Sequence, residues 1–119
     1  MNRGQTSKPQ YDDRRARRRT VDCEEPVTNV LTGEAMGRIG NVSSTGMLLL
    51  CPEEPRSHAL YQCMLPLAAN GSNRHIEVGI QEQWHQPSES SEHYWAGFRI
   101  IAIRDEDHAR LRAWLDMQD

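Results

Sequence analysis

Short apolar runs separated by turn residues cover most of the chain between residues 21 and 104. Val, Ile, Leu and Tyr are frequent in these runs, and Gly, Pro, Asn and Ser gather between them, as in β-strands joined by turns. The runs that we expect to be strands are 26–31, 35–43, 46–51, 58–67, 75–85 and 94–103. Because no helical period separates these six runs, the pattern predicts a small antiparallel barrel or sandwich.

The last part of the chain has a different pattern, which predicts one helix over residues 105–117. Asp105 is the expected N-cap residue, and two more acidic residues follow in the first turn. The apolar side chains recur at helical spacing, at Leu111, Trp114 and Leu115. A lone helix of this length is marginally stable in water, so we expect it to pack against the open side or end of the barrel.

The chain is long enough for one domain with a modest core, with 119 residues of which 37% are hydrophobic. Residues 1–10 are polar and without periodicity, and we expect a disordered tail there. Residues 11–119 then form the domain, with an arginine-rich arm (12–20), a barrel (21–104) and the helix (105–117). The N-terminus has no apolar segment typical of a signal peptide, and no run is long enough to span a membrane, which predicts a cytoplasmic protein.

Three cysteines, Cys23, Cys51 and Cys63, are odd in number and far apart. No CxxC pair occurs, so reduced, buried thiols are expected rather than a disulfide framework or a zinc site.

Charge is unevenly distributed along the chain. Residues 1–19 carry a net charge of +5, mostly from five arginines within Arg14–Arg19, whereas residues 20–119 carry −8. A basic arm favours an anionic ligand, but an acidic body would repel a long polyanion such as duplex DNA. The pattern therefore indicates a small or local anionic partner.

A second polar motif lies between two apolar runs in the segment 37–50. Asn41, Ser43 and Gly46 form the pattern N-x-S-x-x-G where the chain leaves one expected strand and enters the next. Taken alone, this pattern is typical of a turn, because Asn and Ser bond to nearby backbone and Gly adopts positive φ.

The two motifs together, R-x-x-x-R and then [D/N]-x-S-x-x-G, resemble those of the PilZ domain family. This resemblance implies a six-stranded antiparallel β-barrel with a C-terminal helix, and a bacterial receptor for the second messenger cyclic di-GMP. The arginine motif fits in two registers, Arg14 with Arg18 or Arg15 with Arg19. The first places Val21 three residues beyond the second arginine, and the second, with Arg14 before it, gives the form R-R-x-x-x-R. The sequence leaves both registers open.

The resemblance also implies roles for the motif residues. Arginines of the arm would hold phosphate and guanine. A guanidinium binds phosphate with two hydrogen bonds, donates two hydrogen bonds to guanine O6 and N7, and stacks on a purine. Asn41 and Ser43 would bond to a guanine edge, and Gly46 would permit the backbone path. An Asp in place of Asn41 would offer two acceptors to guanine, whereas Asn offers one carbonyl, so weaker binding is expected.

Trp84 is a further candidate for the ligand site. It shares the alternation of Ile76, Val78 and Ile80, after the polar Glu82, as if the strand left the core near the rim of the barrel. An aromatic residue there would stack on guanine. The alternative is a tryptophan that packs at the core or rim, which is the role we expect for Trp95 and Trp114.

No sequence pattern indicates an enzyme, a metal site or a bound cofactor. The five histidines lack HxH and HExxH spacing, and neither a G-x-S-x-G elbow nor a phosphate-binding G-x-x-x-x-G-K-[ST] loop occurs. Together with the resemblance to the PilZ family, this implies a non-enzymatic adaptor, monomeric or weakly dimeric, that binds one cyclic di-GMP or a stacked pair and relays the signal to another protein. The alternatives are a barrel that binds single-stranded nucleic acid and a PilZ-type interaction module without a ligand.

Overall fold

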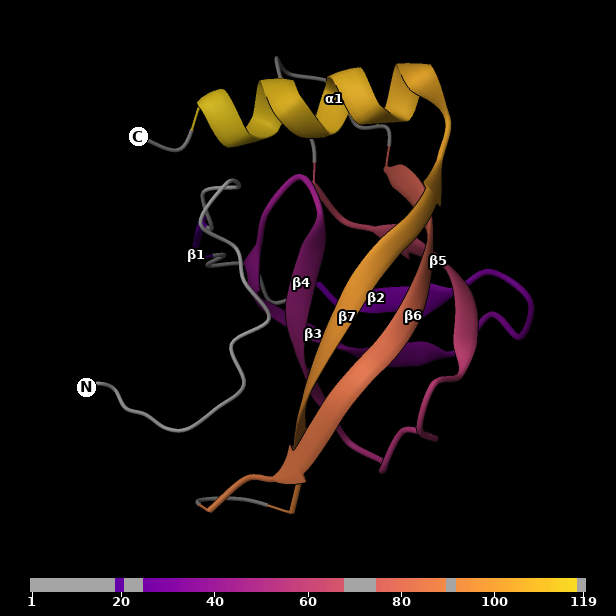
Figure 1. Ribbon diagram of the computed structural model, residues 1–119, viewed down its shortest axis with the longest axis vertical. Coiled ribbons are helices and arrows are strands. Elements are labelled where there is room, and N and C mark those ends of the chain that lie inside the picture. Colours follow the sequence, from indigo (N-terminus) through magenta and orange to yellow (C-terminus); the bar gives the residue numbers. More distant parts are fainter. Residues whose placement is uncertain (1–18, 21–24, 68–74, 90–91, 118–119) are drawn as a thin grey trace.

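The computed structural model describes residues 19–20, 25–67, 75–89 and 92–117. Within these residues the chain forms seven strands and one helix (Figure 1). The elements are β1 (Arg19–Thr20), β2 (Val27–Asn29), β3 (Ala35–Val42), β4 (Gly46–Cys51), β5 (Leu60–Leu65), β6 (Ile76–Pro87), β7 (Tyr94–Ile103) and α1 (Asp105–Asp116). The predictions for the tail and for residues 12–18 of the arm lie outside this part of the chain.

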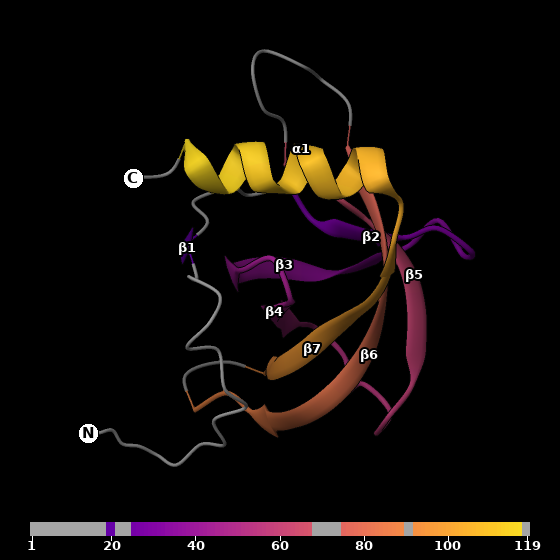
Figure 2. The ribbon, with the colours of Figure 1, turned by 45° about the horizontal axis from the view of Figure 1, so that its top comes forward.

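Strands β2 to β7 form a closed antiparallel barrel (Figures 1 and 2). The hydrogen-bonded order is β3-β2-β5-β6-β7-β4, and a further pairing between β3 and β4 closes the circle. The two-residue strand β1 is added outside this circle and pairs with the C-terminal end of β3. The predicted six-stranded barrel with one C-terminal helix is therefore confirmed.

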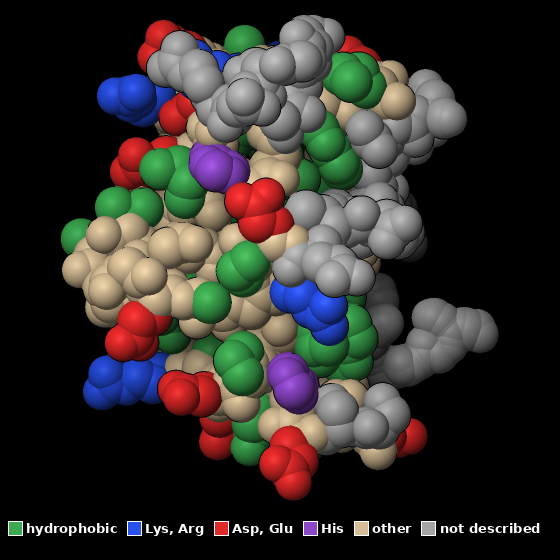
Figure 3. Space-filling model, turned by 180° about the vertical axis from the view of Figure 1, so that it is seen from behind, with side chains coloured by type: hydrophobic (Ala, Val, Ile, Leu, Met, Phe, Trp, Pro, Cys, Tyr) green, Lys and Arg blue, Asp and Glu red, His purple; other side chains and the backbone are tan. Residues whose placement is uncertain are grey.

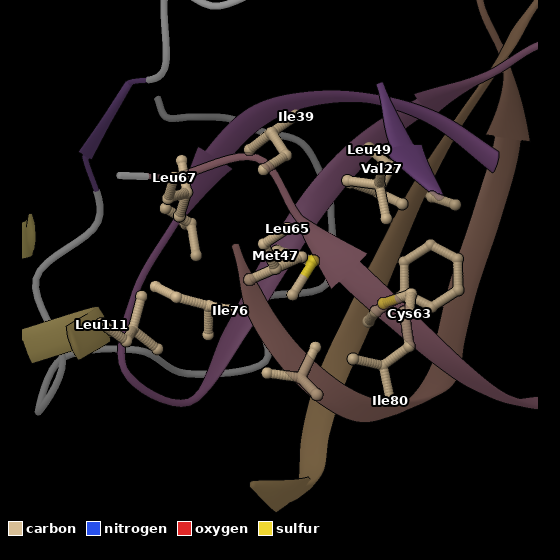
Figure 4. Close-up of a cluster of buried hydrophobic side chains, with 14 of the residues drawn as sticks. Val27, Ile39, Met47, Leu49, Cys63, Leu65, Leu67, Ile76, Ile80 and Leu111 are labelled. Atoms are coloured by element: carbon tan, nitrogen blue, oxygen red, sulfur yellow. The ribbon is translucent and has the colours of Figure 1, made fainter. Parts of the chain in front are cut away.

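Alternate side chains of the strands fill the interior of the barrel (Figure 4). In β4, Met47 and Leu49 are fully buried, whereas Leu48 and Leu50 lie on the outer face and are half-buried. The largest side chain of the core is Phe98, whose ring meets Tyr61 edge to face at a centroid distance of 5.9 Å. Burial of each large apolar side chain of this kind stabilises the fold by roughly 1.5–3 kcal/mol.

The six predicted strands are all present, with ends that differ by a few residues. The first, expected over 26–31, ends at Asn29. There the side-chain oxygen of Asn29 accepts hydrogen bonds from the backbone N–H groups of Leu31 (2.8 Å) and Thr32 (3.3 Å), and the chain turns back through Gly33, which has a φ of 77°. The fifth strand extends two residues beyond its expected end, to Pro87.

Helix α1 lies across one end of the barrel (Figures 1 and 2). Leu111 and Trp114 are buried and belong to the core, and Leu115 packs against it, so the expected docking of the helix is confirmed. The expected N-cap was wrong. Arg104 occupies that position with extended backbone (φ −74°, ψ 153°) and no side-chain cap, because the extended conformation of β7 continues through residue 104 and Asp105 is already helical.

Two of the three cysteines are described, and both are buried free thiols, as expected. Burial raises the pKa of Cys51 to about 11, and burial together with the charge of Glu77 raises the pKa of Cys63 to about 12. These thiols therefore act as small apolar side chains of the core. Cys23 lies outside the described residues. The described part of the chain holds no helix with the length and apolar character needed to cross a membrane.

Candidate ligand-binding site

The end of the arginine run lies beside the N-x-S-x-x-G turn. Strand β1 pairs with β3 so that Arg19 is opposite Val42 and Thr20 is opposite Asn41. The backbone of the last arginine of the run therefore lies at the same end of β3 as the N-x-S-x-x-G motif (Figures 1 and 2). Of Arg19 only the backbone is described, and Arg14, Arg15 and Arg18 lie outside the described residues. The register of the arginine pair thus stays a prediction.

Ser43 is fully buried and bonded within its own turn. Its Oγ accepts hydrogen bonds from the backbone N–H groups of Thr45 and Gly46, both at 3.2 Å, and the Ser43 N–H donates to the Gly46 carbonyl at 2.8 Å. The hydroxyl also lies 3.3 Å from Thr45 Oγ1. These hydrogen bonds stabilise the turn, as is typical of Ser at this position. A contact between Ser43 and a ligand stays a prediction.

Gly46 is required by close packing and not by its backbone angles. Among the described glycines positive φ occurs at Gly33 and Gly37, so the positive φ considered for Gly46 was wrong. A β-carbon at Gly46 would lie 2.6 Å from the carbonyl oxygen of Phe98. The absence of a side chain therefore allows the start of β4 to approach β7, where Gly46 is opposite Arg99.

Asn41 lies in a row of residues that crosses five strands. It is opposite Thr20 of β1 on one side and Leu48 of β4 on the other. Leu48 is in turn opposite Gly97 of β7, and Gly97 is opposite Trp84 of β6. Because neighbouring strands lie about 4.8 Å apart, the three steps from Asn41 to Trp84 span about 14 Å. We call these five residues the outer row, because the side chains of Asn41, Leu48 and Trp84 face away from the core.

Trp84 faces outward because β6 contains a bulge. The pairing shifts between Glu82, which is opposite Phe98, and Trp84, which is opposite Gly97, so that Gln83 is an extra residue. An extra residue reverses the alternation of the strand. The expectation that Trp84 shares the face of Ile80 was therefore wrong: the buried positions continue through Glu82, which is 1% exposed, and Trp84 turns to the opposite face.

The indole of Trp84 lies flat against Gly97. A β-carbon on Gly97 would be 2.7 Å from Cε2 of the ring, so only glycine leaves room for this position. The ring is half-buried, and its Nε1 is shielded without a hydrogen-bond partner among the described residues. Both interpretations of Trp84 are consistent with this placement, since the ring packs against the barrel wall and also lies in the outer row.

The other two tryptophans have different surroundings. Trp114 packs in the core, as expected. Trp95 lies on the outer face, where its Cζ3 would be 3.1 Å from a β-carbon on Gly40. Because Gly40 directly precedes Asn41, Trp95 lies close to the outer row, which the sequence analysis did not anticipate. The pairing of β4 with β7 brings Trp95 there, and no local pattern indicates it.

Arg99 is a second residue that the sequence analysis missed. It is exposed, is opposite Gly46, and lies on the same outer face as Gly97, two residues along β7. No acidic side chain of the described residues forms an ion pair with it. The alternation of Ala96, Phe98 and Ile100 indicates that residue 99 points outward, but only the pairing with β4 places it beside the N-x-S-x-x-G motif.

Other features of the described residues lie away from this face. A hollow of about 280 Å³ is lined by residues that include Pro26, Val30 and Met64, and one of about 210 Å³ by residues that include Met36 and Tyr61. Neither is lined by Ser43, Gly46 or Trp84. Within the described ranges no three His, Cys, Asp or Glu side chains are grouped so that they would hold a metal ion.

Two solved bacterial structures have a similar fold. The Bacillus subtilis inhibitor of motility MotI/DgrA matches with a TM-score of 0.70 and 17% identity over 90% of this chain, which spans about half (51%) of that protein. The PilZ domain of YcgR from Escherichia coli, solved with c-di-GMP, matches with a TM-score of 0.64 and 15% identity over 90% of this chain and 92% of that one. No curated protein matches in sequence.

A family model gives the assignment directly. The model of the PilZ domain matches residues 12–116, which is nearly the whole chain. The protein therefore belongs to the PilZ domain family, as the resemblance of its two motifs implied.

Proposed function

We propose that this protein is a non-enzymatic, cytoplasmic receptor for cyclic di-GMP that relays the bound state to a partner protein. The observation that carries this proposal is the outer row, in which cross-strand pairing connects Thr20, directly after the arginine run, through Asn41 to Trp84. The membership of the PilZ family and the likeness to a PilZ domain solved with c-di-GMP support the choice of ligand.

The arginine run provides the charge that the ligand requires. Cyclic di-GMP carries two phosphates, and a guanidinium binds each phosphate with two charge-assisted hydrogen bonds. The run ends at Arg19 in β1, one residue before Thr20, which is opposite Asn41. Arg99, exposed and opposite Gly46, adds a positive charge at the same place.

The polar and aromatic residues of the face provide the contacts to the bases. Asn41 lies in the outer row, and its carbonyl would accept from a guanine N–H. Ser43 holds the turn that follows, so we propose that its main effect on binding passes through the position of Asn41. Trp84 presents an aromatic ring three strands from Asn41 along the row, a path of about 14 Å along the curved barrel wall, and would stack on a guanine base.

A barrel that binds single-stranded nucleic acid is the second candidate, and the surface charge argues against it. Acidic side chains are spread over the face in Figure 3, and residues 20–119 carry a net charge of −8. A long polyanion would be repelled beyond the arm, whereas a dinucleotide fits within the outer row. A PilZ-fold module without a ligand is the third candidate, and it would leave the arginine run without a role.

Calorimetric titration with cyclic di-GMP tests the proposal, with GTP and an oligothymidine of about ten nucleotides as controls. We expect micromolar or tighter affinity for cyclic di-GMP, far weaker binding of GTP, and no binding of the oligonucleotide at physiological salt. The fitted stoichiometry distinguishes one ligand from a stacked pair. Binding of the oligonucleotide alone would contradict the receptor and favour the barrel that binds single-stranded nucleic acid. If none of the ligands binds, the interaction module without a ligand is the remaining candidate.

A pull-down from bacterial lysate with and without cyclic di-GMP tests the relay. A partner retained only with the ligand is expected for the wild type and is lost in a variant that does not bind cyclic di-GMP. Equal retention under both conditions would contradict the relay while leaving ligand binding intact.

A further inference from the structure

A buried carboxylate lies inside the barrel directly beside the bulge that turns Trp84 outward. Glu82 is 1% exposed and follows the buried Ile76, Val78 and Ile80 in the alternation of β6. Its Oε1 accepts the backbone N–H of His58 at 2.8 Å, and its Oε2 lies 2.6 Å from Nδ1 of His85. A buried charge is strongly unfavourable unless it is paired and hydrogen-bonded, so the partners of Glu82 determine whether it can stay inside.

His85 is bonded on both ring nitrogens. Its Nε2 lies 3.0 Å from Oε2 of Glu54, in the segment between β4 and β5. A neutral imidazole donates through one nitrogen only, whereas the protonated ring donates through both, so two carboxylates favour the charged form. The ring of His85 thus connects the buried Glu82 with Glu54 of the neighbouring segment.

The contact between Glu82 and His85 depends on the bulge. Residues three apart in a regular strand point to opposite faces, because side chains alternate with a period of two. Here the extra residue Gln83 allows both Glu82 and His85 to point inward. The same extra residue turns Trp84 outward, against Gly97. A slip that removed the bulge would separate the buried Glu82 from His85 and would turn Trp84 away from the outer row.

We propose that Glu82 and His85 are positioning residues of the binding face: their contact holds the bulge at Gln83 and so keeps Trp84 in the outer row. This inference rests on the proposed function for its effect on cyclic di-GMP, but the position of Trp84 can be measured without any ligand.

The first experiment follows the indole N–H signal of Trp84 by NMR in the free protein, assigned by its loss in Trp84→Phe. We expect the signal to shift or broaden in His85→Gln. Replacing both residues (Glu82→Gln with His85→Gln) leaves no unpaired buried charge, and should have the same effect if His85→Gln fails to fold. The matched control is His75→Gln, which removes a similar histidine–glutamate contact (3.3 Å to Glu25) just before β6, far from Trp84 along the strand. An unmoved Trp84 signal in the folded variants would overturn the proposal.

The second experiment measures cyclic di-GMP affinity in a double-mutant cycle. Loss of one base-stacking contact is expected to weaken binding by about tenfold or more. We expect His85→Gln to weaken binding by at least about threefold and to have no further effect when Trp84 is already Ala, because it acts through that ring. Equal effects of His85→Gln with and without Trp84 would overturn the link to ligand. If the wild type binds no cyclic di-GMP, the proposed function fails, and the NMR shift alone decides the positioning role.

Discussion

The indole of Trp84 and the backbone of Gly97 are in direct contact on the outside of the barrel, with the ring occupying the place of the missing side chain. This contact lies between the two strands that pair most extensively, β6 and β7. It places an aromatic ring in the same cross-strand row as Asn41 and Thr20, and only glycine at position 97 leaves room for that ring.

Gly97→Ala should displace Trp84, because the added β-carbon would lie 2.7 Å from Cε2 of the ring. Overpacking of this kind costs roughly 1–3 kcal/mol of unfolding free energy, which denaturant unfolding would measure. Gly79→Ala, also in β6, is the control, since its β-carbon would lie 3.2 Å from the side chains of Ala102 and Gln62 and does not meet Trp84. Equal stability loss and an unchanged Trp84 signal in both variants would contradict this prediction.

Ser43→Ala should lower stability, and Asn41→Ala should lower affinity. Ser43 is buried and its Oγ accepts hydrogen bonds from two backbone N–H groups, and the loss of this acceptor costs about 1–3 kcal/mol of unfolding free energy.

Asn41 is half-buried in the outer row, and the loss of one guanine-edge contact in Asn41→Ala costs about 1–3 kcal/mol of binding free energy. Denaturant unfolding and calorimetric titration of both variants separate these effects. Normal binding by Asn41→Ala would remove it from the site.

Alanine substitutions along the arginine run should have unequal effects on binding. In one pair of arginines four residues apart, Arg14 with Arg18 or Arg15 with Arg19, each alanine substitution should reduce the binding free energy by about 1.5–3 kcal/mol, because a charge-assisted hydrogen bond is lost. We expect Arg18 to be the most costly, and Arg17, which belongs to neither pair, is the internal control. Titration of the five single variants at two salt concentrations provides the test. Equal small losses with a large common salt dependence would indicate an electrostatic patch instead.

Stability should decrease on the alkaline side because of His85. Hydrogen bonding to Glu82 raises the pKa of His85 above its usual value of 6.5, and the contact with Glu54 acts in the same direction. A group with a raised pKa in the folded state stabilises the fold fully below its unfolded pKa, and this contribution is lost as pH rises through the folded pKa. The unfolding free energy of the wild type should therefore fall as pH rises above about 6.5, and that of His85→Gln should fall less. Parallel profiles would show that His85 does not titrate in this range.

Much of the architecture follows from local pattern. Alternating apolar residues, such as Met47 and Leu49 or Val78 and Ile80, must share one face of an extended strand, and turn residues end each run, so six strands could be predicted. The spacing of Leu111 and Trp114 predicted the helix and its buried face. The two polar motifs, read together, predicted the family that the comparison identifies.

The arrangement of the candidate site was decided by pairing between distant segments. The alternation of β6 predicts an inward Trp84, and the bulge that reverses it exists because Glu82 finds His58 and His85 as partners and because β7 pairs on both sides of Gln83. Likewise, only the register of β4 with β7 places Arg99 beside Gly46. The sequence by itself determined which residues are apolar, which lie in turns and which carry charge, because these are properties of single side chains and their spacing. Tertiary structure alone decided which of them share a face, because cross-strand hydrogen bonds and the partners of one buried carboxylate select the register.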